Sequence, residues 1–247
     1  MGKKYKLTEE TINVYGRTLH RIESLRDFGN VKKGDKGGFI ENEDNLSQWD
    51  DCWVYDNAKV YNDAVVYDNA MVFKNAMVYG NAKVSGNAKV YGNAKVYGNV
   101  QVYGDAQVSG DAWVIGDAKV YGDARVFGDA EICDNVRVYG NAEVFGNVHI
   151  KGDADISSIS DYIFFKNWWS SGRCFTWTRS NNMWSVGCFY GTGEELIAKA
   201  YKDSEISGKE YELVVKYVES ILKDGNTTTI VNKIKQRLIK IIKKFNL

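Results

Sequence analysis

The sequence lacks the segments and motifs that would place it in several large classes of protein. It has no stretch of about 18 apolar residues and no apolar N-terminal signal core, so we expect a cytoplasmic protein without a membrane span. It also lacks a G-x-S-x-G motif, a P-loop and a paired acidic motif. The 32 basic and 32 acidic residues balance, which argues against binding of long nucleic acids.

Cysteine is scarce and shows no paired spacing. The four cysteines are Cys52, Cys133, Cys174 and Cys188, and without a C-x-x-C pair we predict no metal site and no other cofactor. Cys174 and Cys188 flank an expected hairpin turn. In a chain without an export signal we expect both to stay reduced.

What the sequence does contain is a strict repeat of six residues. Aliphatic residues occupy every sixth position from Val54 to Ile156, and Asn or Asp follows three residues after each of them up to Ile150. In a unit such as Ala88-Lys89-Val90-Tyr91-Gly92-Asn93, Ala and Val face one side of a strand, and Lys and Tyr face the other. Gly followed by Asn or Asp forms a tight corner. A short strand and a corner, repeated, predict a parallel β-helix.

These hexads resemble those of the hexapeptide-repeat family, whose left-handed β-helix takes three hexads per coil. The resemblance covers residues 52–156. The left hand is implied by the resemblance alone, because period and composition set no hand.

We therefore expect a mainly β protein with appendages on both sides of a left-handed parallel β-helix at 52–156. Residues 1–51 are predicted to be a small β cap in which Ile40 and Leu46 begin the first coil. Residues 157–223 read as an aromatic-rich α+β domain, with a meander followed by two helices. Residues 230–247 read as a basic amphipathic helix.

An enzymatic role is not favoured. The family resemblance brings acyltransferases and zinc carbonic anhydrases into view, but the anhydrases need three histidines per zinc and this chain has only His20 and His149. Acyltransferases use a histidine base, often beside an inserted loop, and the hexads around His149 carry no insertion. We assign no catalytic residue and keep an acyltransferase-like enzyme as the third hypothesis.

The outward residues suggest a ligand-binding surface. Twelve of the 18 residues that follow the aliphatic positions are Tyr or Phe, which predicts rings stacked along each edge of the prism. Rings beside Lys or Arg suit a nucleobase and a phosphate. The candidate contacts are Tyr91, Tyr97, Tyr103, Lys89 and Lys95, or, in the meander, Trp168, Trp169, Arg173 and Arg179. A plain hydrophobic core is the alternative for the meander residues.

Apolar residues at other outward positions suggest a homotrimer, an assembly common among such β-helices. The predicted interface residues on the β-helix are Trp53, Met71, Met77 and Trp113. The tail adds an apolar seam with the spacing of a helical bundle, at Val231, Ile234, Leu238, Ile241 and Phe245.

The order of the N-terminal motifs resembles a group of phage and prophage proteins. It places Arg26-Asp27-Phe28-Gly29-Asn30-Val31 and Gly38-Phe39-Ile40-Glu41 ahead of the hexads. The resemblance implies a phage-encoded protein in a bacterial cytoplasm. There, a non-catalytic trimer could sequester a nucleotide-type signal of host defence. The alternative hypothesis is an interaction or assembly scaffold that binds a host protein and no small ligand.

Overall fold

The structure, a computed structural model, describes residues 2–223. Its residues group into two compact units. The first comprises residues 2–167 and 172–190, and the second comprises 168–171 with the described residues from 191 onward. The predicted tail helix at 230–247, with its seam residues, lies outside the described residues.

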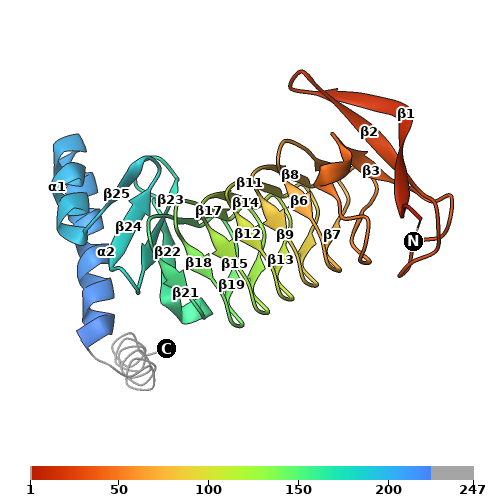
Figure 1. The fold of residues 1–247 in the computed structure, drawn as a ribbon. Helices are drawn as coiled ribbons and strands as arrows, with labels where there is room; N and C mark the ends of the chain where they lie inside the picture. The colour runs from red at the N-terminus through yellow and green to blue at the C-terminus, as the bar shows by residue number, and fades with distance from the viewer. Residues whose placement is uncertain (1, 224–247) are drawn as a thin grey trace, which may run out of the picture. The chain divides into compact units, whose positions relative to one another are not determined.

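A parallel β-helix of about seven turns forms the body of the first unit (Figure 1). The first face holds β3 (Lys36–Ile40), β5 (Lys59–Val60), β8 (Met77–Gly80), β11 (Lys95–Gly98), β14 (Trp113–Gly116), β17 (Glu131–Ile132) and β20 (His149–Ile150). The second face holds β4 (Trp53–Val54), β7 (Met71–Val72), β10 (Lys89–Val90), β13 (Gln107–Val108), β16 (Arg125–Val126) and β19 (Glu143–Val144). The third face holds β6 (Val65–Val66), β9 (Lys83–Val84), β12 (Gln101–Val102), β15 (Lys119–Val120), β18 (Arg137–Val138) and β21 (Asp155–Ile156).

The register confirms three hexads per coil. Val90 pairs with Val108 and Lys95 pairs with Trp113, so each residue meets the one 18 positions later. The Ala and Val positions, such as Ala88 and Val90, are fully buried in one continuous core. The two small apolar residues of each hexad therefore fill the prism, and the residues between and after them face outward.

Glycine at the corners allows the coils to approach closely. Gly98 has φ +89°, and a Cβ added there would lie 2.7 Å from the carbonyl oxygen of Gly116 on the next coil. Positive φ is open to Gly at little cost. The corner geometry thus explains why Gly recurs at this point of the hexad.

The N-terminal cap is confirmed. β1 (Tyr5–Val14) and β2 (Arg17–Ser24) form an antiparallel hairpin that continues into β3, and β3 pairs in parallel with β5 through Ile40 and Val60. After the short helix η1 (Glu43–Asn45), Leu46 bridges to Val66. Ile40 and Leu46 therefore begin the first coil, as predicted.

The prediction that Trp53 faces a neighbouring subunit is wrong. Trp53 is 1% exposed, and the rings of Tyr5 and Phe28 pack edge-on against it at 6.0 and 5.3 Å. The cap folds over the outward side of the first coil and buries this indole within the chain. The outward position of Trp53 in its hexad does not show that the cap covers it.

The meander covers the other end of the β-helix. The turn η2 (Ile159–Asp161) leads into an antiparallel sheet of β22 (Tyr162–Lys166), β23 (Cys174–Thr178), β24 (Met183–Val186) and β25 (Phe189–Gly191). Tyr162 joins the core of the prism and donates its hydroxyl to the carbonyl of Glu143. The predicted α+β domain at 157–223 joins this sheet to the helices, whereas the contacts of the sheet group it with the β-helix.

The second unit contains the two predicted helices, α1 (Gly193–Asp203) and α2 (Glu205–Lys223). Thr192 caps α1 by accepting a hydrogen bond from the amide of Glu195, whose side chain bonds back to the amide of Thr192. Neither of these helices has the length and apolar character needed to cross a membrane.

Candidate functional site

The outward rings form stacked columns, as predicted. Rings one coil apart lie 4.7 to 5.3 Å between centroids, and their planes are within 13° of parallel. The stacked sets are Tyr61–Tyr79–Tyr97, Phe73–Tyr91, Phe127–Phe145 and Tyr103–Tyr121–Tyr139. Stacking covers the backbone and stabilises neighbouring coils, so the rings have a structural role of their own.

Two of these columns are interrupted by serine. Ser85 stands where a ring is expected between Tyr67 and Tyr103, and Ser109 stands between Tyr91 and Phe127. Each interruption leaves an open space, of about 330 Å³ at Ser85 and about 230 Å³ at Ser109. The serines are only 8% and 9% exposed, so they lie on the floors of these spaces. We call them the Ser85 slot and the Ser109 slot.

Each slot has the dimensions of a missing ring. Strands on successive coils are about 4.8 Å apart, so Tyr67 and Tyr103, two coils apart, are separated by about 9.6 Å. A planar ring midway between them would lie about 4.8 Å from each, within the spacing that the stacked columns already show. The Ser85 slot can therefore hold a flat aromatic group by the contacts that the columns use elsewhere.

Polar residues line the Ser85 slot on the strand side. Lys83 and Gln101 pair directly across β9 and β12, and both line the slot. Among residues 2–223, Lys83 forms no ion pair, and its side chain is exposed. The Gln101 side-chain amide offers hydrogen-bond donors and an acceptor. The slot thus combines two ring walls with a cation and an amide.

The Ser109 slot has similar parts, but they already interact with one another. Tyr91 donates its hydroxyl to Gln107 Oε1 at 3.4 Å. Arg125 pairs with Gln107 on the neighbouring strand and forms an ion pair with Glu143 Oε1 at 3.4 Å. A ligand there would have to compete with these bonds, so the Ser85 slot is the better candidate.

The structure separates the ring and lysine residues that the sequence analysis grouped. Tyr103 lines the Ser85 slot and Tyr91 lines the Ser109 slot. Tyr97 ends a stacked column, where burial raises the pKa of its phenol. Lys95 Nζ lies 4.3 Å from the Trp113 ring centroid, and Lys89 lies between Met71 and Gln107 on the second face.

The four candidates in the meander fall in different parts of the chain. Trp168 and Trp169 belong to the second unit, where Trp169 packs edge-on against Tyr211 at 5.1 Å. Arg173 and Arg179 belong to the first unit. The meander buries an aromatic core formed by Phe175, Trp177 and Trp184. Its rings thus include the plain core that the sequence analysis gave as the alternative.

The remaining interface candidates lie on two faces of the prism. Met77 and Trp113 are on the first face and Met71 is on the second. Both methionines are partly covered within the chain, and Trp113 is 37% exposed.

Four lining residues of the slots were not among the predicted contacts: Ser85, Ser109, Lys83 and Gln101. The signal was present in the spacing of 18 residues, because Ser85 breaks a column whose other members from Tyr67 to Tyr139 are tyrosines. A single hexad does not reveal the interruptions, because they appear only between residues 18 positions apart.

Comparison with known families supports the repeat architecture. The family described as YdcK beta solenoid repeat matches residues 88–104, a segment that ends just after Tyr103 of the Ser85 slot. No curated protein matches the chain. The match covers one short part of the sequence and supports a β-solenoid.

Proposed function

We propose that the protein is a non-catalytic binding protein that holds a nucleotide-type ligand in the Ser85 slot. The observation that carries the proposal is the missing ring at Ser85, with Tyr67 and Tyr103 left as walls on either side. Base–aromatic stacking contributes about 1 to 3 kcal/mol per base and tolerates every base. A nucleobase is therefore the ligand group that suits these walls.

The strand residues complete this assignment. Lys83, which has no ion-pair partner within residues 2–223, supplies a cation for a phosphate, and Gln101 can bond the edge of a base. A single slot with one nearby cation suits a small nucleotide better than a long polymer, since polymer binding needs many phosphate contacts. The balanced charge of the chain agrees with this choice.

Native mass spectrometry of the full chain mixed with cyclic oligonucleotides and NAD-derived nucleotides tests the proposal. We expect one discrete nucleotide mass per slot. Isothermal titration calorimetry with the retained nucleotide then compares the affinities of variants. Ser85→Tyr should abolish binding because the protein's own ring fills the slot, and Lys83→Ala should weaken binding about tenfold through the lost charged contact.

Ser109→Tyr is the matched control, because it fills the other slot with the same side chain. It should leave the affinity of the Ser85 slot unchanged. Retention of the nucleotide by Ser85→Tyr would overturn the assignment to this slot. A wild-type protein that retains no nucleotide would overturn nucleotide binding itself.

The biological role that we propose is sequestration of a nucleotide-type host defence signal by a phage-encoded protein in the bacterial cytoplasm. Two features support this role. The β-helix is a rigid scaffold that carries the Ser85 slot, and the N-terminal motifs resemble those of phage proteins. A phage mutant that lacks the protein should then grow poorly only on hosts that make such a signal.

We further propose a homotrimer. Met77 and Trp113 on the first face and Met71 on the second would each meet one neighbour, because a closed threefold arrangement brings two faces of every prism into contact. Sedimentation equilibrium of Met77→Glu, compared with Lys119→Glu on the third face, tests this. Dissociation confined to Met77→Glu is expected, whereas an unchanged mass for both variants would oppose the trimer.

An assembly scaffold without a small ligand is the second candidate, and one observation favours it. Ile206, Leu213 and Tyr217 on α2 are 67, 64 and 49% exposed, and their spacing places them along one side of the helix. Large exposed apolar side chains in a row are typical of contact surfaces. Leu213→Glu should release a bound protein partner under this hypothesis and should leave nucleotide binding unchanged under the first.

A further inference from the structure

Three potential metal ligands converge on the first face near the end of the β-helix. Glu131 and His149 pair directly across β17 and β20. Cys133 lies two residues after Glu131, so its side chain leaves the strand on the same side. All three residues are half-buried.

The three ligand atoms have the separations that a small metal ion requires. His149 Nε2 lies 3.0 Å from Glu131 Oε2 and 3.7 Å from Cys133 Sγ, and all three atoms lie within 4.8 Å of one another. A tetrahedral zinc ion with bonds of about 2.0 to 2.3 Å separates its ligand atoms by roughly 3.3 to 3.6 Å. Small side-chain adjustments would bring the three atoms to these distances.

A nucleophilic Cys-His-Glu triad does not fit the same geometry. In such a triad the two imidazole nitrogens contact different partners, whereas here Nε2 alone faces both the carboxylate and the thiol. Atoms that converge on one point indicate an ion rather than a relay of protons.

The charges of the ligands themselves suit a divalent cation. The Glu131 carboxylate and a metal-bound Cys133 thiolate would neutralise the ion. Lys151 directs its ammonium to the carbonyl oxygen of Gly187 at 3.0 Å, and Thr176 accepts a hydrogen bond from the His149 amide. The backbone that carries His149 is therefore also bonded to the meander.

We propose that Glu131 Oε2, Cys133 Sγ and His149 Nε2 form a zinc site with one open position. Mixed sulfur, nitrogen and oxygen ligands favour zinc over magnesium or calcium. Three protein ligands leave a fourth position for water or an exchangeable ligand. The prediction of no metal site rested on the lack of paired cysteines, whereas these ligands lie on consecutive coils.

Cobalt(II) titration of the reduced, chelator-treated full chain tests the site. Co²⁺ replaces Zn²⁺ in such sites and reports both thiolate ligation and tetrahedral geometry in its absorption spectrum. We expect a thiolate-to-cobalt charge-transfer band and tetrahedral ligand-field bands at one equivalent of metal. Added Zn²⁺ should remove both bands by displacing the cobalt.

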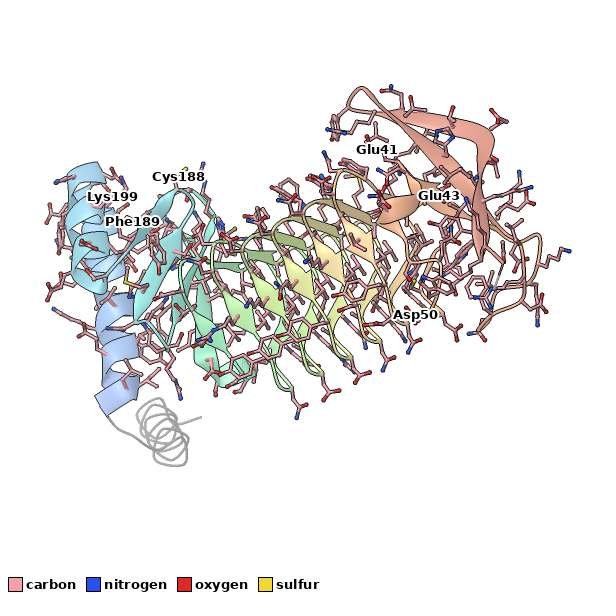
Figure 2. All side chains as sticks on the ribbon, viewed as in Figure 1. Glu41, Glu43, Asp50, Cys188, Phe189 and Lys199 are labelled. Carbon is pink, nitrogen blue, oxygen red and sulfur yellow. The ribbon has the colours of Figure 1, made fainter. Side chains whose placement is uncertain are left out.

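Variants assign the ligands. Cys133→Ser should abolish the charge-transfer band, and His149→Gln and Glu131→Gln should each weaken cobalt affinity at least tenfold. Cys188→Ser is the matched control, since Cys188 is an exposed thiol in the loop between β24 and β25 (Figure 2) and should leave the spectrum unchanged. Circular dichroism should show an unchanged β-helix in every variant.

Two results would overturn the proposal. One is a wild-type protein whose spectrum stays that of hydrated cobalt, and the other is a charge-transfer band that persists in Cys133→Ser. If Cys133→Ser fails to fold, His149→Gln decides the question, because its imidazole loss should weaken cobalt binding while leaving the thiol in place.

Discussion

Asn87 donates its side-chain amide to the carboxylate of Asp105, one coil further along, at 3.0 Å. The oxygen of the Asn87 amide in turn accepts a hydrogen bond from Asn69. Two parallel sets, Asn75–Asn93–Asp111 and Asn81–Asn99–Asp117, follow the same pattern. Each set ends at an aspartate because a carboxylate has no proton to donate to the next coil.

Replacement of Asp105 with Asn should extend the first of these sets. The new amide can donate a hydrogen bond to Asp123 on the next coil. The substitution also removes one of two neighbouring carboxylates and so their mutual repulsion. We expect the free energy of unfolding to rise by about 0.5 to 1 kcal/mol, measured from the urea midpoint. Asn87→Asp is the reverse control and should lower it by a similar amount. A loss of stability in Asp105→Asn would contradict this account.

Gly98→Ala and Gly146→Ala separate two costs at the corners. Both residues have positive φ, at +89° and +80°. A Cβ at Gly98 meets the Gly116 carbonyl oxygen at 2.7 Å, whereas at Gly146 the nearest atom is 3.6 Å away. We expect Gly146→Ala to cost about 1 kcal/mol and Gly98→Ala at least about 2 kcal/mol in chemical unfolding. Equal losses would show that backbone contact between coils is unimportant.

Tyr61→Phe should stabilise the protein near neutral pH. The Tyr61 hydroxyl is buried and has no hydrogen-bond partner among the described residues. Removing an unsatisfied buried hydroxyl should raise the free energy of unfolding by about 1 kcal/mol. Chemical unfolding at pH 7 measures the change, and a loss of stability would mean that the hydroxyl has a partner.

The same substitution should alter the response to alkali. Burial raises the pKa of Tyr61 from 10.0 to about 12. Between these values the unfolded state loses the phenol proton while the native state keeps it, so stability falls as pH rises from 10 toward 12. Tyr61→Phe should therefore lose less stability across this window than the wild type. Parallel pH profiles for both proteins would refute the assignment.

Ser85→Tyr should stabilise the β-helix whether or not a ligand binds. The new ring would stack between Tyr67 and Tyr103 and restore the interrupted column. Aromatic pairs contribute about 0.5 to 1.5 kcal/mol beyond burial of area, so we expect a gain of about 1 kcal/mol or more. Ser85→Ala is the control, since it removes the hydroxyl without adding a ring. A destabilised Ser85→Tyr would mean that the slot is narrower than a ring.

The six-residue period was sufficient to predict the coil, its inward residues and the stacked rings. Each of these follows from strand alternation and from identical chemistry in every hexad, as Val90 and Tyr91 illustrate. The N-terminal cap followed from the two-residue phase shift of Ile40 and Leu46. The burial of Trp53 did not, because it depends on Tyr5 and Phe28, which reach it from outside the repeat.

The candidate sites were harder to predict because they arise between coils. The Ser85 slot depends on residues 18 positions apart, and the Glu131, Cys133 and His149 group depends on the pairing of β17 with β20. A search along the chain treats these residues as remote. Their proximity becomes visible only once the number of hexads per coil is known.

The 18-residue register also governs how a gene for such a chain can change in length. Removal of residues 86–103 would leave the Ser85 slot walled by rings, because Tyr121 would take the place of Tyr103. Removal of one hexad between Ser85 and Ser109 would instead bring the two serines into the same column and merge their slots into one longer trough. This whole-coil deletion therefore keeps the ring walls of the slot but replaces Gln101 with Lys119, while a single-hexad deletion creates a new surface.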